Sequence, residues 1–443
     1  MSALAAMAAT AVAITGCGST GSGGAVGATT GHITLVVQNG DGGEPGLLAG
    51  YRALNKVFEE QHPGVTIDFV TKNLADLVTT DKLQLSGNTV PDVTEINQGY
   101  GAGDMGPLVA DHLLLNLDGY AKKYNWTSRQ SPRLLALDGR FSSNGTTFGS
   151  GPLYGIAATG AWVGLWVNTR LAHSLGIGSP PTTMAALNHD LAVAKAHGDI
   201  PMQYNAADCS WYFGSLLMPL DPQLILDSVF ETPGTTFENQ QTHTAAETIL
   251  TWGTRGYFPP GWTANRVTDN FNQFLGGHTL FAVDGSWNVP LPSTAPTADF
   301  AMVPFPSVGG PAAPDAIATG DAAWSIPAHS KHQALAAEYI NFLTSVSSAT
   351  TWISTGSVPA TLPANLSAAI SASHLTGVSK DALVGWQQIL SKGTPVNYPD
   401  WATPTFIVTL GNEVTELGAG KITPSAFDAA LQADYGAYVK SKQ

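Results

Sequence analysis

The chain has 443 residues, of which 44% are apolar and only 12% are charged. This length and apolar content predict an ordered protein of two or three domains and argue against a disordered chain. The net charge of −14 at pH 7 argues against nucleic acid or an anionic membrane as a partner, because both require a basic surface.

The first 31 residues have the composition of an export signal followed by a tether. Residues 3–14 form an apolar run that is too short to span a bilayer. The run ends in Ile14-Thr15-Gly16-Cys17, which resembles a bacterial lipobox. The pattern predicts a signal peptide over 1–16, cleavage before a lipidated Cys17, and a flexible tether of small residues over 17–31.

Two points about this segment stay open. Met1-Ser2 contains no Lys or Arg, so the signal can begin upstream, and a short buried helix with a chance Cys is the alternative interpretation. If Cys17 carries lipid, the second cysteine, Cys209, has no partner. We therefore expect no intramolecular disulfide.

A βαβ unit follows the tether. Residues 32–37 form a β-branched run that predicts a strand, and residues 47–61 have apolar side chains at helical spacing. The His62-Pro63-Gly64 sequence stops this helix, and residues 65–70 predict a second strand. A strand, a helix and a strand in this order predict a parallel sheet.

The rest of the chain alternates in a similar way, without an internal repeat. Further strands are predicted over 91–96, 153–156, 163–167, 277–283, 301–306 and 322–326. Further helices are predicted over 74–86, 183–197, 244–256 and 331–344. Residues 140–151 are polar and rich in Gly and Ser, which predicts a surface loop.

Seven segments, in this order and spacing, resemble motifs of one protein family. They are residues 58–67 (FEEQHPGVTI), 91–93 (PDV), 151–156 (GPLYGI) with Asn168, 176–182 (GIGSPPT), 280–287 (LFAVDGSW), 330–343 (SKHQALAAEYINFL) and 420–424 (GKITP). The chain is similar in these segments to the family 1 extracellular solute-binding proteins of ABC importers. The resemblance runs from about residue 32 to the end.

The resemblance implies an α/β fold of two lobes, the type II periplasmic-binding-protein-like fold, with discontinuous lobes and a hinge. The lobes would be residues 32–160 plus 305–345 and residues 161–304 plus 346–443. It implies a monomer that captures a carbohydrate, most simply an oligosaccharide, in the interlobe cleft. The partners would be the transmembrane permease subunits of the importer and, through the lipid anchor, the outer face of the cytoplasmic membrane.

Candidate site residues follow from how proteins recognise sugars. Aromatic rings stack on the C–H faces of the sugar, and Asp, Asn, Gln or Glu side chains bond its hydroxyls. Trp or Tyr beside Asp or an amide, near predicted strand ends or in predicted loops, gives these candidates: Gln98, Tyr100, Trp211 (in a predicted loop with Asp208 and Tyr212), Asp284, Trp287, Asp321, Trp324, Tyr398 and Trp401. Asp41 is a candidate because it follows the first predicted strand, and Trp162 because it stands at the crossing into the second lobe. In the resemblance, Trp287 occupies a ligand-stacking position. For each Trp, burial in a core is the alternative.

Other classes of function have weaker support in the sequence. The aromatic loops contain no Glu, and the chain has no G-x-S-x-G, no H-E-x-x-H and no Cys/His cluster. We therefore expect no enzyme activity, no cofactor and no metal. The same loops contain no Lys or Arg, which favours a neutral ligand. A non-sugar solute, such as a polyol phosphate or a peptide-like osmolyte, and a secreted carbohydrate-active enzyme remain the alternatives.

Overall fold

The computed structural model describes residues 32–204, 209–264, 271–289, 291, 295–308 and 314–442. The predicted signal peptide, the tether and Cys17 lie outside the described residues, as does Asp208, which the sequence places beside Trp211. Among the described residues, the helices are too short or too polar to cross a membrane.

The first of two large sheets has four strands in the order β11-β3-β1-β2. β1 (Ile33–Asn39) pairs in parallel with β2 (Val65–Thr71) and β3 (Val93–Ile96), and β11 (Ala323–Ser325) pairs antiparallel with β3. Helix α1 (Pro45–Gln61) connects β1 to β2. The predicted βαβ unit and its parallel pairing are confirmed.

Local sequence explains where α1 begins and ends. A proline at the start of a helix loses no hydrogen bond, and Pro45 stands there. Tyr51 and Phe58 lie on the apolar face of the helix and are fully buried. The backbone N–H of His62 closes the last turn on the carbonyl of Phe58, at 3.0 Å. Gly64 then adopts a left-handed φ of 95°, which turns the chain into β2.

The second sheet has the order β12-β10-β6-β8-β7, and β9 also pairs with β6. Its strands are β6 (Gly160–Asn168), β7 (Ile200–Gln203), β8 (Thr279–Gly285), β9 (Phe300–Val303), β10 (Ala316–Gly320) and β12 (Pro395–Val396). β6 is antiparallel to β8, β9 and β10. All nine residues of β6 are buried, as expected for a strand covered on both faces.

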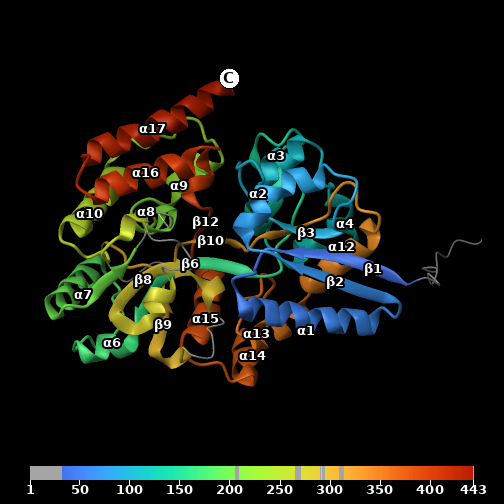
Figure 1. The fold of residues 1–443 in the computed structure, drawn as a ribbon, viewed down its shortest axis with the longest axis horizontal. Coiled ribbons are helices and arrows are strands. Elements are labelled where there is room, and N and C mark those ends of the chain that lie inside the picture. The colour runs from blue at the N-terminus through green and yellow to red at the C-terminus, as the bar shows by residue number, and fades with distance from the viewer. Residues whose placement is uncertain are drawn as a thin grey trace, which may run out of the picture.

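Figure 1 shows the two sheets side by side, each with its own helices. With the first sheet lie α2 (Leu74–Leu85), α3 (Met105–Ala110), α4 (Asp118–Tyr124) and α12 (Gln333–Leu343). With the second lie α6 (Thr169–Ser174), α7 (Met184–His197), α8 (Cys209–Leu217), α9 (Pro222–Val229), α10 (Gln240–Thr254), α16 (Phe406–Gly418) and α17 (Pro424–Ser441). The others are α5 (Pro132–Gly139), α13 (Val346–Ser354), α14 (Leu366–Ser373) and α15 (Gly377–Lys392).

Three chain segments cross between the sheets and are hydrogen-bonded to one another. The segment before β6 lies in the middle: Gly160 donates to the carbonyl of Val358 at 2.8 Å, and Asp321 donates to the carbonyl of Thr159 at 2.9 Å. In the third segment, the backbone N–H of Ala360 donates to the carbonyl of Ala158, at 3.0 Å. These bonds connect the two halves through a narrow bundle of backbone, which is the geometry of a hinge.

The predicted loop over 140–151 is wrong. Residues in this range form a hairpin of β4 (Arg140–Phe141) and β5 (Phe148–Leu153). The rings of Phe141 and Phe148 are both buried and lie 4.7 Å apart between centroids. Glycines with positive φ, such as Gly145 at 67°, make the turn and bends of this hairpin and also gave it the composition of a loop.

Two other expectations need correction, and two strands were missed. Trp211 and Tyr212 were expected in a loop, but both lie in α8, where Tyr212 is buried in the core. The strand predicted over 153–156 shares only Leu153 with β5. β7 and β10 were not predicted, because each is a short run without clear alternation and its burial comes from packing in the second sheet.

Candidate functional site

A cavity of about 540 Å³, here called the main cavity, is lined by elements of both sheets. Asp41, Gln98, Trp287 and Asp321 reach it from segments that follow β1, β3, β8 and β10. α2 contributes an apolar edge, and α8, α16 and the short helix η7 (Pro399–Ala402) contribute from the second half. In open α/β sheets, ligands bind at the carboxyl ends of strands, and the volume is within the range of small-molecule sites.

Asp41 is held in place by a buried carboxylate on the neighbouring strand. Glu95 of β3 accepts from the Asn39 amide at 2.8 Å, from the backbone N–H of Gly40 at 2.7 Å and from the Tyr51 hydroxyl at 2.7 Å. The Asn39 amide also donates to Asp41, at 2.8 Å. Glu95 is 1% exposed, so its role is to fix the turn that carries Asp41 into the main cavity.

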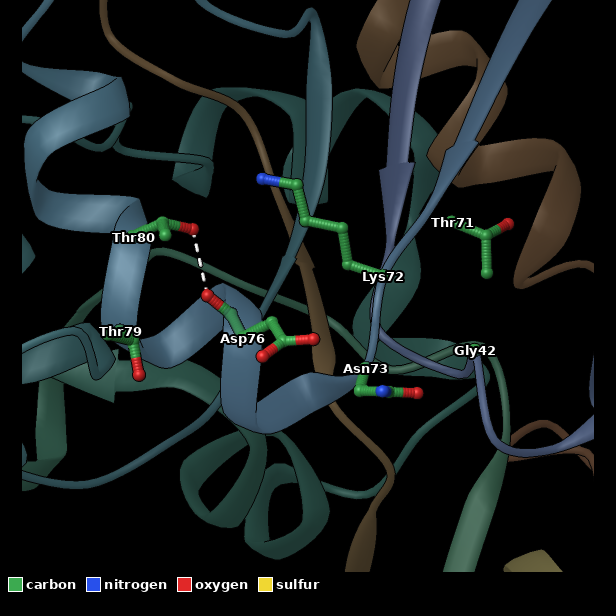
Figure 2. A pocket seen from close by; sticks show the side chains of 7 residues that line it. All are labelled: Gly42, Thr71, Lys72, Asn73, Asp76, Thr79 and Thr80. Atoms are coloured by element: carbon green, nitrogen blue, oxygen red, sulfur yellow. Dashed lines mark hydrogen bonds between the residues drawn. The ribbon is translucent and has the colours of Figure 1, made fainter.

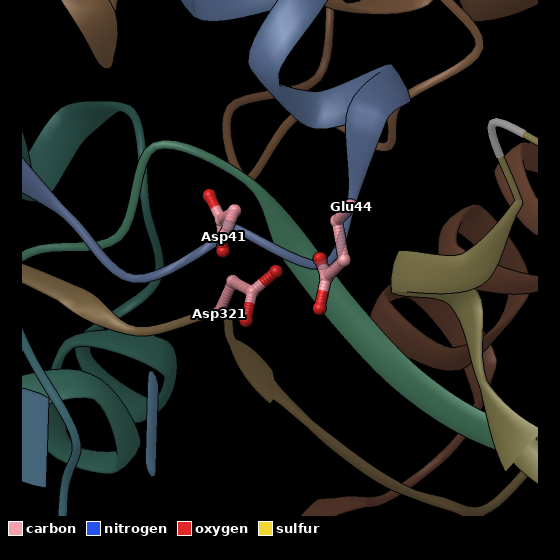
Figure 3. Close-up of side chains that lie close together, drawn as sticks. All are labelled: Asp41, Glu44 and Asp321. Atoms are coloured by element: carbon pink, nitrogen blue, oxygen red, sulfur yellow. The ribbon is translucent and has the colours of Figure 1, made fainter. Parts of the chain in front are cut away.

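Three carboxylates converge on one point of the main cavity. One oxygen each from Asp41, Glu44 and Asp321 lies within 4.8 Å of the other two, and Figure 3 shows the three side chains facing a common space. They come from the loop between β1 and α1 and from the turn between β10 and β11. Like charges at this separation repel each other, more strongly where water is partly excluded.

Burial and this repulsion shift the acidity of the cluster. Burial raises the pKa of Asp41 to about 8, and the Asp321 carboxylate adds to the increase. Burial also raises the pKa of Asp321 to about 6. The pKa of Glu44 rises well above its ordinary value, first through burial and then through the charges of Asp41 and Asp321. Each shift disfavours the charged form.

The crossing segment that carries Asp321 is fixed by several contacts. Gln98 donates its side-chain amide to the backbone carbonyl of Asp321, at 3.0 Å. The backbone N–H of Ala322 donates to the carboxylate of Asp321 at 3.0 Å. The preceding residue, Gly320, leaves no room for a side chain, because a Cβ there would lie 2.1 Å from that of Ala157. Glycine is therefore required where the segments cross.

Two tryptophans form an aromatic wall of the main cavity. The rings of Trp287 and Trp211 meet edge to face with centroids 5.1 Å apart, a favoured aromatic geometry. Trp287 lies in the short helix η5 (Ser286–Asn288) directly after β8. Its ring folds back over Gly285, where a Cβ would come within 2.0 Å of the ring. Asp284 accepts from the N–H of Gly285 at 2.7 Å and so stabilises this turn.

A second aromatic pair comes from η7 and the residue before it. The rings of Tyr398 and Trp401 lie 5.1 Å apart between centroids. Trp401 also meets Phe148 of the hairpin edge to face, at 5.8 Å. Asp400, between them, lines the main cavity, and burial raises its pKa to about 6. Aromatic rings and carboxylates thus share the lining of the main cavity.

The structure brings seven of the sequence-predicted residues together and leaves four elsewhere. Those that line the main cavity are Asp41, Gln98, Trp211, Trp287, Asp321, Tyr398 and Trp401. The lining does not include Tyr100, Trp162, Asp284 or Trp324. A common cavity is what the predicted role requires, but a ligand contact for each of the seven stays a prediction.

The four residues outside the lining have structural contacts of their own. Trp162 is fully buried and donates its indole N–H to the carbonyl of Ala382, at 2.9 Å. Trp324 is fully buried, with its ring 5.4 Å from that of Tyr51. Tyr100 donates to Glu231 at 3.2 Å and lines a separate hollow of about 430 Å³ with Tyr438 and Lys442. Asp284 is 2% exposed.

Sequence reasoning missed part of the lining. Glu44 was not a candidate, because no aromatic residue stands beside it and, of the loop after the first strand, only Asp41 was selected. The signal that was available is its position: Glu44 closes the loop after β1 and stands directly before the first residue of α1. Asn97, directly after β3, also lines the main cavity and was missed.

A second hollow, here called the surface hollow, lies near the main cavity and has a different lining. Its volume is about 610 Å³, and Figure 2 shows the seven residues around it: Gly42, Thr71, Lys72, Asn73, Asp76, Thr79 and Thr80. None is aromatic, and Thr80 uses its hydroxyl to bond the backbone carbonyl of Asp76, at 2.8 Å. Without a ring to stack a ligand, this hollow is a weaker candidate than the main cavity.

The three converging carboxylates are also the described residues best placed to hold a cation. Oxygen ligands suit hard ions such as Ca²⁺, which takes six to eight of them at 2.3–2.6 Å. Asp41, Glu44 and Asp321 offer one well-placed oxygen each. A metal would therefore require several further ligands, and the expectation of a site without metal stays a prediction.

The family model described as bacterial extracellular solute-binding protein matches residues 41–350. No curated protein matches the chain significantly. Many solved structures do share its fold.

Three of these structures illustrate the similarity. One, from a study of xylan utilisation by Caldanaerobius polysaccharolyticus, has a TM-score of 0.73 at 20% identity and covers 90% of this chain and 99% of its own. A chitin oligosaccharide binding protein has 0.72 at 16%, covering 92% and 100%. A maltose/maltodextrin-binding domain from Bdellovibrio bacteriovorus, bound to maltotriose, has 0.67 at 16%, covering 92% and 100%. The predicted two-lobed α/β fold class is confirmed.

Proposed function

We propose that this chain, which belongs to the bacterial extracellular solute-binding protein family, captures a carbohydrate in the main cavity and delivers it to the permease of an ABC importer. The ligand is most simply an oligosaccharide. The observation that carries the proposal is the lining itself, in which Trp287, Trp211 and Trp401 stand together with carboxylates and the amide of Gln98. Structural neighbours that bind chitin oligosaccharides or maltotriose by their descriptions support it.

The lining offers both interactions that a sugar needs. The aromatic pairs present apolar faces for the C–H side of a pyranose ring, and Asp41, Asp321 and Gln98 present hydrogen-bonding atoms for its hydroxyls. Trp211 and Trp401 are separate from Trp287 in the chain and lie in different elements. We propose that they extend the site into subsites for more than one ring.

We propose that binding closes the two halves over the ligand. The proposed lobes are residues 32–160 plus 305–345 and residues 161–304 plus 346–443. β10 pairs with β6 of the second sheet, so we propose that the chain crosses between the lobes later than residue 305, at the turn between β10 and β11. The hydrogen-bonded crossing segments would be the hinge. The proposed state is a monomer.

The experiment for this function is a thermal-shift screen with purified protein. A saturating ligand that binds the folded state raises the melting temperature in a concentration-dependent way. We expect neutral or amino oligosaccharides to stabilise the protein and to be recovered unchanged. Stabilisation only by anionic solutes, such as polyol phosphates, would overturn the sugar proposal. The described lining offers no Lys or Arg for a phosphate.

We also propose that the protein is exported and held at the outer face of the cytoplasmic membrane by lipid on Cys17. The support is the lipobox-like sequence before this residue and the tether after it. Changing Cys17 to Ser should release the protein into the medium or leave the signal uncleaved. A variant that enters the detergent phase as fully as the parent would contradict the anchor.

The family is one of binding proteins, and we propose that this chain does not turn its ligand over. Purified protein incubated with oligosaccharides should give no hydrolysis products. Product formation that purifies with the protein and disappears in Asp321→Asn would contradict this and revive the carbohydrate-active enzyme alternative. A glycosidase needs two carboxyl groups at a defined separation. Because the main cavity contains several carboxyl groups, hydrolysis has to be assayed directly.

A further inference from the structure

The charged side chains of the main cavity are all of one sign. Asp41, Glu44, Asp321 and Asp400 line it, and no Lys, Arg or His stands among the described lining residues. The charges do not come from one segment: they stand in the loop after β1, the turn after β10 and the helix η7. Four acids from three separate segments therefore face one cavity.

Two of these carboxylates are incomplete in their hydrogen bonding. Oε2 of Glu44 and Oδ1 of Asp400 are buried atoms without a hydrogen-bond partner in the described part of the chain. Buried polar atoms normally have partners, and leaving a charged one without any is costly. Both side chains line the main cavity, so a donor group on a ligand there is a candidate partner for them.

The carboxylates around Asp41 add to this requirement. Three acidic oxygens within 4.8 Å of one another cannot all be ionised without a large electrostatic cost unless a positive charge joins them. The pKa of Asp41, raised to about 8 by burial and by Asp321, agrees with this cost. Without a ligand, bound protons reduce the negative charge of the cluster. Glu95 of β3 lies behind Asp41 and adds a further acidic group.

We propose that the ligand is a cationic sugar, an amino sugar or an oligosaccharide that contains one, whose ammonium group binds between Asp41, Glu44 and Asp321 while its ring stacks on the tryptophan wall. This inference rests on the proposed function and names the ligand class of the same site. An ammonium donates three hydrogen bonds and forms strong, charge-assisted bonds to carboxylates.

The aromatic half of the lining supports the same class. A cation near the face of Trp or Tyr is attracted by the ring, with the largest effect when water is excluded. Trp287, Trp211 and Tyr398 share the main cavity with the acids. Leu74, Val78 and Ile407 give it an apolar edge that a hydrated metal ion would not contact favourably. A sugar ring with an ammonium substituent uses both halves.

The experiment compares sugars that differ at one position. Cellobiose, its glucosamine analogue and N,N′-diacetylchitobiose share ring and linkage but carry hydroxyl, ammonium or acetamide groups at C2, and the corresponding monosaccharides and α-linked dimers complete the panel. Thermal shift and calorimetric titration are measured at neutral pH, at low and at high salt. We expect the ammonium sugar to bind at least about tenfold more tightly than its hydroxyl partner, a difference in binding free energy of ~1.4 kcal/mol. High salt should reduce this difference.

Variants assign the effect to the cluster. Glu44→Gln and Asp321→Asn, alone and together, should bring the ammonium and hydroxyl sugars to similar affinity. The matched control is Asp76→Asn, which removes an acid of the surface hollow and should leave the preference unchanged. Because a like-charge cluster is relieved by these changes, we expect the variants to fold at least as stably as the parent.

Each other outcome overturns the inference. Equal or tighter binding of the neutral sugars overturns it and leaves the proposed sugar function standing. If no sugar in the panel binds, both the inference and the proposed sugar function are wrong. Saturable stabilisation by CaCl₂ alone, reversed by a chelator and lost in Asp321→Asn, overturns it in favour of a metal site. A preference that survives in the double variant shows that the cluster does not carry it.

Discussion

The sequence contains the pattern D-x-x-W three times near the site; one copy, at 208–211, begins outside the described residues, and the other two place their side chains in opposite ways. In Asp284-Gly-Ser-Trp287 the tryptophan lines the main cavity and the aspartate is buried. In Asp321-Ala-Ala-Trp324 the aspartate lines the cavity and the tryptophan is fully buried. The first pattern begins at the end of β8 and continues into a helical turn, η5, whereas the second enters a strand, β11. The comparison teaches that the element after the aspartate decides which side chain reaches a ligand.

The largest effect should come from Trp324→Ala. The ring is packed edge to face on Tyr51 in the core of the first half, and its loss leaves a cavity in a well-packed core. We expect the free energy of unfolding to fall by ~3–5 kcal/mol, measured by urea denaturation. If stability changes little while ligand affinity collapses, Trp324 belongs to the binding site and the contrast between the two patterns fails.

Trp287→Ala should have the opposite profile. Its ring contacts Trp211 and the cavity, so we expect it to lower affinity by ~1–3 kcal/mol, or roughly five- to hundredfold. The loss of stability should be smaller than in Trp324→Ala, because Trp287 is only partly buried. Calorimetric titration and urea denaturation of the same sample separate the two effects. An unfolded Trp287→Ala protein would mark this ring as core.

The pH dependence of stability tests the environment assigned to Asp321 and to its neighbour in the cluster, Asp41. The pKa of Asp41 is raised from 3.8 to about 8 and that of Asp321 from 3.8 to about 6, in both cases mainly by burial. A raised pKa gives stability that is complete below the unfolded value and is lost as pH rises through the folded value. The ligand-free protein should therefore lose stability progressively as the pH rises from about 4 to about 8.

The matched variant for this pH effect is Asp41→Asn, which cannot ionise. Its melting temperature should fall less between acidic and slightly alkaline pH than that of the parent, as followed by circular dichroism. The control is Asp76→Asn at the surface hollow, whose melting temperature should change with pH as that of the parent does. A parent protein whose stability rises over this pH range would contradict the shifts assigned to Asp41 and Asp321.

The smallest effect should come from Asp284→Asn. The carboxylate is 2% exposed and accepts from Gly285 and from the Asn288 amide, so an amide oxygen can replace it as the acceptor. We expect ligand affinity to change by about 0.5 kcal/mol or less, roughly twofold. Asp321→Asn provides the comparison, with a larger loss of affinity for an ammonium sugar. A larger loss in Asp284→Asn would reverse the assignment of the two aspartates.

Much of the fold was predictable because local patterns and tertiary structure agree there. The strand over 32–37, the helix over 47–61 and the strand over 65–70 match β1, α1 and β2 closely. The hairpin over 140–153 was missed, because its glycines resemble those of a loop and its two phenylalanines meet only across the turn. Pairing between distant strands, as for β10 with β6, leaves little trace in a single segment.

The site was predictable as a list of residue types at strand ends, but not in its side-chain directions. Trp211 and Tyr212 are neighbours in α8, yet Trp211 lines the main cavity and Tyr212 is buried against Tyr204. Which face of a helix or strand meets the cavity depends on the packing of the whole half. Glu44 was missed for a related reason: only the fold brings it to Asp41 and Asp321.

The most direct test of the binding site is a crystal structure of the protein with a sugar carried through purification or soaked from the panel. The predicted result is a pyranose ring on Trp287, with its polar groups toward Asp41, Glu44 and Asp321 and the two halves closed around it. A sugar bound in the surface hollow around Asp76, or in the hollow beside Tyr100, with the main cavity left empty at saturating ligand, would contradict the proposed site.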